Sequence, residues 1–130
     1  MICDRHGNIA DAEATTAGPE VFHDQGAGYL AHTNHFLCDR YSTAENLKLS
    51  LADSAPRHER INALIKSRYG SIELDDIKRF LSDHSGYPTS ICRHASDMQT
   101  VASMISEPVQ RRMHVAFGNP CQHRYVTYSM

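Results

Sequence analysis

The chain has 130 residues, of which 41% are hydrophobic and 22% are charged, and its net charge is -2. These values suit one globular domain over residues 1–130 and exclude nucleic acid as the main partner, because no basic stripe is present to neutralise phosphates. No apolar run approaches the roughly 18 residues of a membrane span and no signal peptide opens the chain, which predicts a cytoplasmic protein without a membrane partner.

The first part of the chain predicts antiparallel strands. The extended stretches are residues 1–5, 9–15, 20–23 and 29–37. The first two form a hairpin, because Gly7 and Asn8 between them tolerate a positive φ. In the second arm the alanines at alternate positions form a small face that can pack against the core. Residues 38–53 are polar and mixed, which predicts a surface connection with no more than a helical turn.

Two helices are predicted next. Ser54 is a candidate N-cap with Pro56 in the first turn, and Gly70 is the C-terminal stop. The apolar residues that helical spacing places toward the core are Ile61, Leu64, Ile65 and Tyr69. A second helix covers about residues 74–82, and the run Asp83-His84-Ser85 after it is expected to cap its end.

Strand patterns return after Pro88. They cover residues 89–94, 100–105, 114–117 and 124–128. Strands, then two helices, then strands are typical of an α+β fold with an antiparallel sheet.

Two of the predicted strands carry polar side chains between apolar neighbours. These blocks are His32-Thr33-Asn34-His35-Phe36 and Ser90-Ile91-Cys92-Arg93-His94. An Asn held rigidly on a strand offers an amide donor to a developing oxyanion, and Arg93 suits a substrate carboxylate or a tetrahedral intermediate. Strand parity places His32, Asn34 and Phe36 on one face. Alternatively, both residues have structural roles: Asn34 holds a neighbouring loop in place by hydrogen bonds, and Arg93 forms an ion pair.

The histidines and cysteines favour a different class of function, in which they bind zinc. The candidate ligands are the run His32, His35 and Cys38 and the pairs Cys92 with His94 and Cys121 with His123. Residues i and i+3 on a strand point to opposite faces, so His32 and His35 share an ion only if a turn intervenes. The alternative function is therefore a small zinc-binding or protein-interaction module.

Several short motifs occur along the chain in the order of a known family. They are Asp4-Arg5-His6-Gly7, Glu13, Gly28 to Phe36, Leu81-Ser82-Asp83-His84, Ser90 to His94, Thr100-Val101-Ala102-Ser103 and Gly118-Asn119-Pro120-Cys121. Over nearly its whole length the chain resembles the C-terminal part of the acyl-coenzyme A:6-aminopenicillanic acid acyltransferase family, the C45 peptidase-like N-terminal nucleophile hydrolases. The resemblance implies a partial αββα sandwich and an acyltransferase or amidohydrolase acting on small-molecule amide or thioester acyl groups.

The resemblance also implies residue roles. Asn34 takes the oxyanion or nucleophile-orienting role and Arg93 a second polar role in the catalytic pocket. His32, His35 and Phe36 are assigned to substrate binding. No cofactor and no metal is implied, and acyl-coenzyme A would enter as a substrate.

Members of this family attack with the thiol of an N-terminal Cys, whose own α-amine acts as base. Cys3 is followed by Asp4 and matches the hairpin instead, and the other three cysteines lie elsewhere in the pattern. The expected source of the nucleophile is a separate or missing N-terminal segment. The chain alone is then expected to be inactive and to expose an apolar edge where the catalytic strand would pack.

Overall fold

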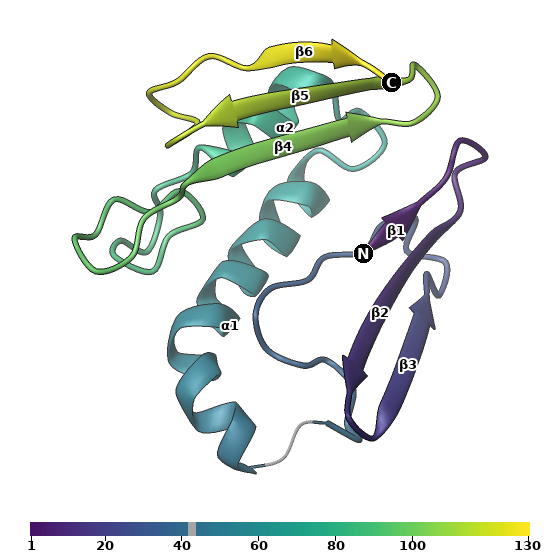
Figure 1. Ribbon diagram of the computed structural model, residues 1–130, viewed down its shortest axis with the longest axis vertical. Helices are drawn as coiled ribbons and strands as arrows, with labels where there is room; N and C mark the ends of the chain where they lie inside the picture. The colour runs from purple at the N-terminus through teal and green to yellow at the C-terminus, as the bar shows by residue number, and fades with distance from the viewer. Residues whose placement is uncertain (42–43) are drawn as a thin grey trace. The chain divides into compact units, whose positions relative to one another are not determined.

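The computed structural model describes the backbone of residues 1–41 and 44–130 and the side chains of residues 1–41 and 52–130 (Figure 1). The chain divides into two compact units, Met1–His58 and Glu59–Met130. The described elements are two helices and two three-stranded antiparallel sheets, which confirms the predicted α+β fold. The single domain predicted for residues 1–130 stays a prediction.

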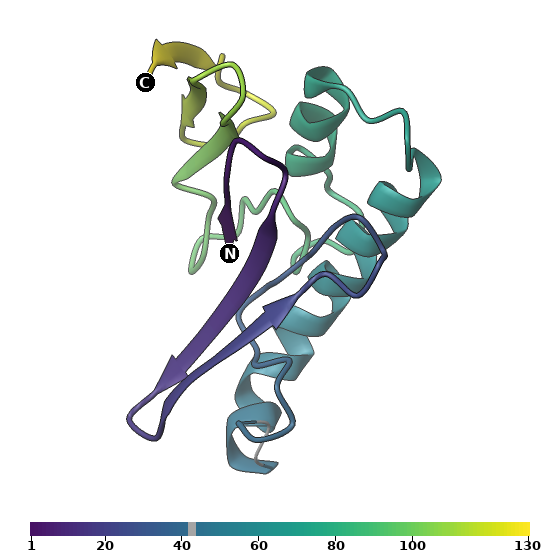
Figure 2. The ribbon, with the colours of Figure 1, turned by 90° about the vertical axis from the view of Figure 1, so that its right-hand side faces the viewer.

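The first unit contains a sheet of three antiparallel strands, visible in Figures 1 and 2. In sheet order they are β1 (Ile2–Cys3), β2 (Ile9–Thr15) and β3 (Gly18–His23). The predicted hairpin is confirmed. Its turn is closed by the Asp4 carboxylate, which accepts hydrogen bonds from the backbone N–H groups of His6 (2.8 Å) and Asn8 (3.0 Å). Gly7 supplies the positive φ of +86°.

The buried face of β2 is the acidic one. Asp11 and Glu13 are each 4% exposed, whereas Ala12 and Ala14 are exposed. The prediction that the alanine face packs inward is therefore wrong. Buried carboxylates are tolerated where hydrogen-bond donors meet them, and a loop of the same unit provides those donors.

The strand predicted over residues 29–37 is wrong, because this segment is an irregular loop. Its backbone N–H groups donate to side chains that lie far away in the sequence. Those of Asn34 and His35 bond to the Ser54 hydroxyl, and that of Leu37 bonds to the Glu13 carboxylate. Side-chain acceptors thus take the place of a neighbouring strand. The alternation of side chains between two strand faces therefore does not apply to this segment.

The first helix, α1 (Ala44–Ser67), begins ten residues before the predicted N-cap at Ser54, so the predicted start and the predicted connection over 44–53 are wrong. Residues 42–43 lie outside the described part of the chain. Pro56 lies inside the helix. Nearby carbonyls are satisfied by side chains, since Thr33 donates to the Ser54 carbonyl oxygen (3.2 Å) and Arg57 to that of Asp53 (3.3 Å).

The end of α1 agrees with the predicted stop. The helix ends at Ser67, and Gly70 follows with a φ of +79°. Tyr69 lies beyond the helix and is 57% exposed, so its predicted place in the core is wrong.

The second unit contains the predicted second helix and a second sheet. The elements are α2 (Leu74–Leu81), β4 (Ala102–Glu107), β5 (Arg112–Phe117) and β6 (Val126–Ser129). The sheet order is β4-β5-β6, with both pairs antiparallel. Glu73 and Asp76 form a capping box at the start of α2, and Phe80 is buried. Three of the four predicted strands are confirmed here, with shifted ends.

The fourth of these predicted strands, over residues 89–94, is wrong. The segment consists of turns and bends with one isolated bridge from His94 to Gln99. Ser90 donates its hydroxyl to the Cys92 carbonyl (2.6 Å), and Cys92 donates its N–H to the Asp83 carbonyl (2.9 Å). These local bonds replace a strand ladder.

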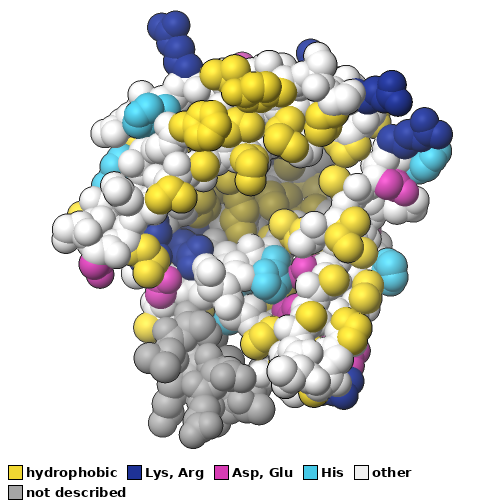
Figure 3. Space-filling model, viewed as in Figure 1, with side chains coloured by type: hydrophobic (Ala, Val, Ile, Leu, Met, Phe, Trp, Pro, Cys, Tyr) yellow, Lys and Arg dark blue, Asp and Glu magenta, His cyan; other side chains and the backbone are white. Residues whose placement is uncertain are grey.

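One face of the second sheet carries exposed apolar side chains. Met104, Phe117, Val126 and Tyr128 are between 46% and 67% exposed, and Figure 3 shows apolar side chains gathered over this sheet. The apolar edge expected where the catalytic strand would pack stays a prediction. Among the described helices, none is both long enough and apolar enough to cross a membrane.

Candidate functional site

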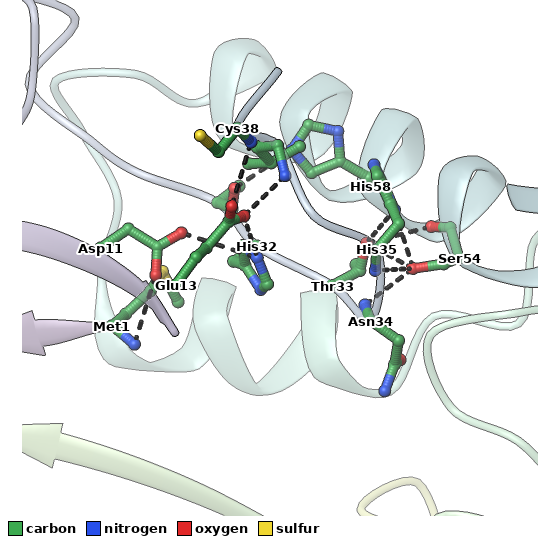
Figure 4. A network of polar contacts seen from close by, with 12 residues as sticks. Met1, Asp11, Glu13, His32, Thr33, Asn34, His35, Cys38, Ser54 and His58 are labelled. Atoms are coloured by element: carbon green, nitrogen blue, oxygen red, sulfur yellow. Dashed lines mark hydrogen bonds and ion pairs between the residues drawn. The ribbon is translucent and has the colours of Figure 1, made fainter. Parts of the chain in front are cut away.

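Glu13 is the centre of a polar network in the first unit (Figure 4). Its carboxylate accepts hydrogen bonds from the N–H groups of Leu37 (2.6 Å) and Cys38 (3.0 Å). His32 Nε2 lies 3.0 Å from the same carboxylate. Burial opposes ionisation of Glu13, but these donors outweigh it, so the pKa of Glu13 is lowered. The ionised carboxylate therefore holds the loop against β2.

Asp11 lies on the same face of β2 and extends this network. Its carboxylate is 3.8 Å from His32 Nε2 and 3.6 Å from the amino nitrogen of Met1. Asp11, Glu13 and His32 bring potential metal-ligating atoms within 4.8 Å of one another. Both Glu13 oxygens, however, already accept backbone N–H groups. The cluster is thus better explained as an anchor for the loop than as a cation site.

Ser54 anchors the next part of the loop. Its hydroxyl oxygen accepts hydrogen bonds from the N–H groups of Asn34 (2.7 Å) and His35 (3.1 Å), and the hydroxyl donates to Thr33 Oγ1 (2.8 Å). The Ser54 side chain is fully buried. His35 Nδ1 lies 2.9 Å from the same hydroxyl. Burial and the nearby His58 lower the pKa of His35, so its ring is neutral near pH 7.

Replacing Ser54 by alanine should lower the free energy of unfolding by about 2 kcal/mol, because two loop N–H groups lose their acceptor. Chemical denaturation of the full chain measures this change. The matched control is Ser67→Ala, which removes an exposed hydroxyl that donates to the Leu64 carbonyl in its own helix turn and should cost less than about 0.5 kcal/mol. Equal effects of the two substitutions would contradict the anchoring role.

Asn34 combines a fixed backbone with an exposed side chain. Arg57 Nη2 donates to Asn34 Oδ1 at 2.6 Å, and Arg57 is itself paired with Asp53 at 3.3 Å. Because the amide oxygen is engaged by Arg57, the NH₂ group is the part of the amide that Asn34 offers to a ligand. That donor suits the oxyanion role predicted for it.

The other predicted site residues have different surroundings. His32 is partly exposed beside Glu13, whereas His35 is buried against Ser54. Phe36 packs against Tyr41, with 5.4 Å between ring centroids. Whether these side chains contact substrate stays a prediction.

Arg93 lies in the second unit and is partly buried. Its N–H donates to Thr100 Oγ1 (3.0 Å), and its guanidinium contacts Met98 Sδ (2.6 Å). Asn34 belongs to the first unit. The grouping of Asn34 and Arg93 around one acyl group therefore stays a prediction.

The second unit gathers sulfur and nitrogen side chains that the sequence placed in separate motifs. His84, Cys92, His94 and Cys121 bring one ligand atom each within 4.8 Å of the others. His123, which the sequence paired with Cys121, instead bonds through Nδ1 to the carbonyl oxygen of Asn119 (3.1 Å). Burial and the neighbouring Cys92 sulfur raise the pKa of the Cys121 thiol.

Sequence reasoning gave no site role to four residues that these clusters use. Asp11 and Glu13 stand two apart on a strand, a spacing that places both carboxylates on one face and signals a shared role. Ser54 was assigned to a helix start and His84 to a helix end. Both signals are local, and a partner distant in sequence overrides each of them.

A shallow apolar pocket of about 200 Å³ lies beside the hairpin of the first unit. It is lined by Met1, Ile2, Cys3, Ile9, Ala10 and Leu30. None of the predicted site residues Asn34, His32, His35 and Phe36 contributes to this lining.

Comparison with known proteins agrees with the resemblance seen in the sequence. A family model described as acyl-coenzyme A:6-aminopenicillanic acid acyl-transferase matches residues 1–122. No curated protein matches the chain at a significant level.

Proposed function

Because the chain belongs to the acyl-coenzyme A:6-aminopenicillanic acid acyl-transferase family, we propose that it supplies part of an acyl-transfer site of the N-terminal nucleophile type. The α+β architecture agrees with the N-terminal-nucleophile-hydrolase-like fold of that family. The substrate class is an amide or thioester acyl group of a small molecule. Acyl-coenzyme A enters as a substrate, and no cofactor is needed.

The observation that carries this proposal is the fixed position of Asn34. Two constraints fix it: the Ser54 hydroxyl accepts its backbone N–H, and Arg57 donates to its amide oxygen. A donor whose position is set before the reaction stabilises developing negative charge without reorganising. Asn34 would therefore donate its amide N–H to the acyl oxygen as the tetrahedral intermediate forms.

The other predicted residues take supporting roles in this proposal. Arg93 binds a carboxylate of the substrate or the charge of the intermediate. His32 and Phe36 contact the substrate from the same loop. His35, which is buried and neutral, acts from behind the loop by fixing Asn34 through Ser54.

The attacking thiol comes from outside these 130 residues. In this mechanism the base is the free α-amine of the nucleophilic Cys, whose pKa near 8 lets it accept the thiol proton. Cys3 is followed by Asp4 and matches the hairpin, and Cys38, Cys92 and Cys121 lie at other points of the family pattern, so none of them takes the place of that nucleophile. A separate N-terminal segment is therefore the proposed partner. All four cysteines are free thiols, which supports a cytoplasmic location.

The full chain by itself should therefore show no thiol-dependent cleavage of an acyl thioester or an acyl anilide. The measurement compares the chain with its four single Cys→Ser variants, and all five rates should equal the buffer rate. Hydrolysis that is lost on alkylation and on one of these substitutions would refute the external nucleophile.

A further inference from the structure

Three loops of the second unit meet at one point. His84 follows α2, Cys92 and His94 lie in the bent segment after Pro88, and Cys121 lies in the turn after β5. The residues come from positions up to 37 apart in the sequence, and each directs its ligand atom to the same place. Such convergence is not expected of histidines scattered over a surface.

Four of the six distances between these atoms lie close to the edges of a zinc tetrahedron, and all six are within 4.8 Å. With Zn–S near 2.3 Å and Zn–N near 2.05 Å, the edges are about 3.8 Å between sulfurs, about 3.6 Å between sulfur and nitrogen and about 3.3 Å between nitrogens. Cys92 Sγ lies 3.6 Å from Cys121 Sγ and 3.6 Å from His94 Nε2. His94 Nε2 lies 3.2 Å from Cys121 Sγ and 3.0 Å from His84 Nε2.

The loops are held in place by bonds outside the cluster. The Asp83 carboxylate, next to His84, receives two hydrogen bonds from Arg60 of α1 (3.0 and 2.6 Å). Asn119 Nδ2 donates to the Arg93 carbonyl between Cys92 and His94 (2.5 Å). The same amide nitrogen lies 3.7 Å from Cys92 Sγ. Support of this kind orients ligands before a metal arrives.

We propose that His84, Cys92, His94 and Cys121 form a structural zinc site in the second unit. Two thiolates and two imidazoles are the donor set that zinc takes in closed, four-coordinate sites, and such sites stabilise the fold instead of binding substrate. The zinc site does not depend on the proposed acyl chemistry. Because Arg93 lies between two of the ligands, the metal would also fix the loop that carries it.

A disulfide between Cys92 and Cys121 explains less of the geometry. Both cysteines are free thiols. A disulfide needs neither imidazole, yet the rings of His84 and His94 turn toward each other with 5.0 Å between centroids and direct Nε2 atoms at the same point. The convergence of both rings with both sulfurs therefore favours a cation.

The test measures zinc in the full chain, refolded with zinc under reducing conditions and freed of excess metal. Wild type should retain about one zinc ion per chain by elemental analysis. His84→Gln and Cys121→Ser, at exposed positions, should lose it. The matched controls His23→Gln and Cys3→Ser, exposed and in the first unit, should keep it.

Cobalt substitution gives a second readout, and its main result comes from wild type. Wild type loaded with cobalt should show the visible bands of a tetrahedral site and a thiolate charge-transfer band, and Cys121→Ser should weaken the latter. The proposal is overturned by a wild type that retains no metal, by metal retained in both ligand variants, or by an octahedral cobalt spectrum without thiolate bands. Equal loss of metal from the controls would overturn it as well.

Discussion

Replacing Glu13 by glutamine should lower the free energy of unfolding of the full chain by about 3 kcal/mol. Glutamine keeps the size of the side chain but turns one acceptor into a donor. The N–H groups of Leu37 and Cys38 both point at the present carboxylate, and His32 lies beside it. The substitution therefore places an NH₂ group against an N–H group in a buried position. Denaturant unfolding measures the change.

The stability lost on Glu13→Gln should also depend on pH. Folding lowers the pKa of Glu13 from its ordinary 4.5, so the carboxylate stabilises the fold above that pH. This contribution disappears as the pH falls through the lowered pKa of the folded state. The stability difference between wild type and Glu13→Gln should thus be full well above pH 4.5 and shrink as the pH falls below 4.5.

The matched control for this prediction is Glu20→Gln on the neighbouring strand. Glu20 is paired with Arg40 at 2.5 Å, but the Arg40 side chain is 55% exposed, so loss of the pair should cost less than about 1 kcal/mol. A stability loss of the same size in both variants, or a Glu13→Gln loss that does not change with pH, would contradict the role of Glu13 as the ionised anchor.

Replacing Asn34 by alanine should lower kcat roughly 100- to 1,000-fold in the enzyme assembled with its nucleophile-bearing segment, the usual effect of removing an oxyanion donor. KM should change little, because the amide is proposed to act on the charge that forms during the reaction. The backbone anchor at Ser54 does not involve the Asn34 side chain, so the fold should persist. Steady-state kinetics with an acyl thioester measure both constants.

The matched control here is Asn8→Ala. Asn8 is exposed at the hairpin turn, and its side chain bonds only to Asp4 among the contacts of the described residues (2.7 Å). This substitution should leave kcat unchanged. If Asn34→Ala raised KM alone, Asn34 would be a binding residue; if it unfolded the chain, Asn34 would be a structural residue. Either result would refute the oxyanion role.

Local patterns predicted the parts of this fold that depend on local interactions. The Gly7 turn, the second helix and the Gly70 stop use contacts within a few residues, and the structure contains all three. Predictions from local sequence signals were wrong where a residue distant in the sequence bonds to the same side chain. Ser54 with Pro56 is typical of a helix start, but the Ser54 hydroxyl bonds to a loop about twenty residues earlier, and α1 continues through both residues.

The sequence by itself determined the family, the α+β class and the polar blocks that contain Asn34 and Arg93, because motif order and periodicity are properties of the linear chain. Only the tertiary structure decided that Asp11 and Glu13 are buried and that His84 joins Cys92, His94 and Cys121. The reason is physical. A buried carboxylate or a metal ligand is stabilised by groups distant in the sequence, and only folding brings those groups together.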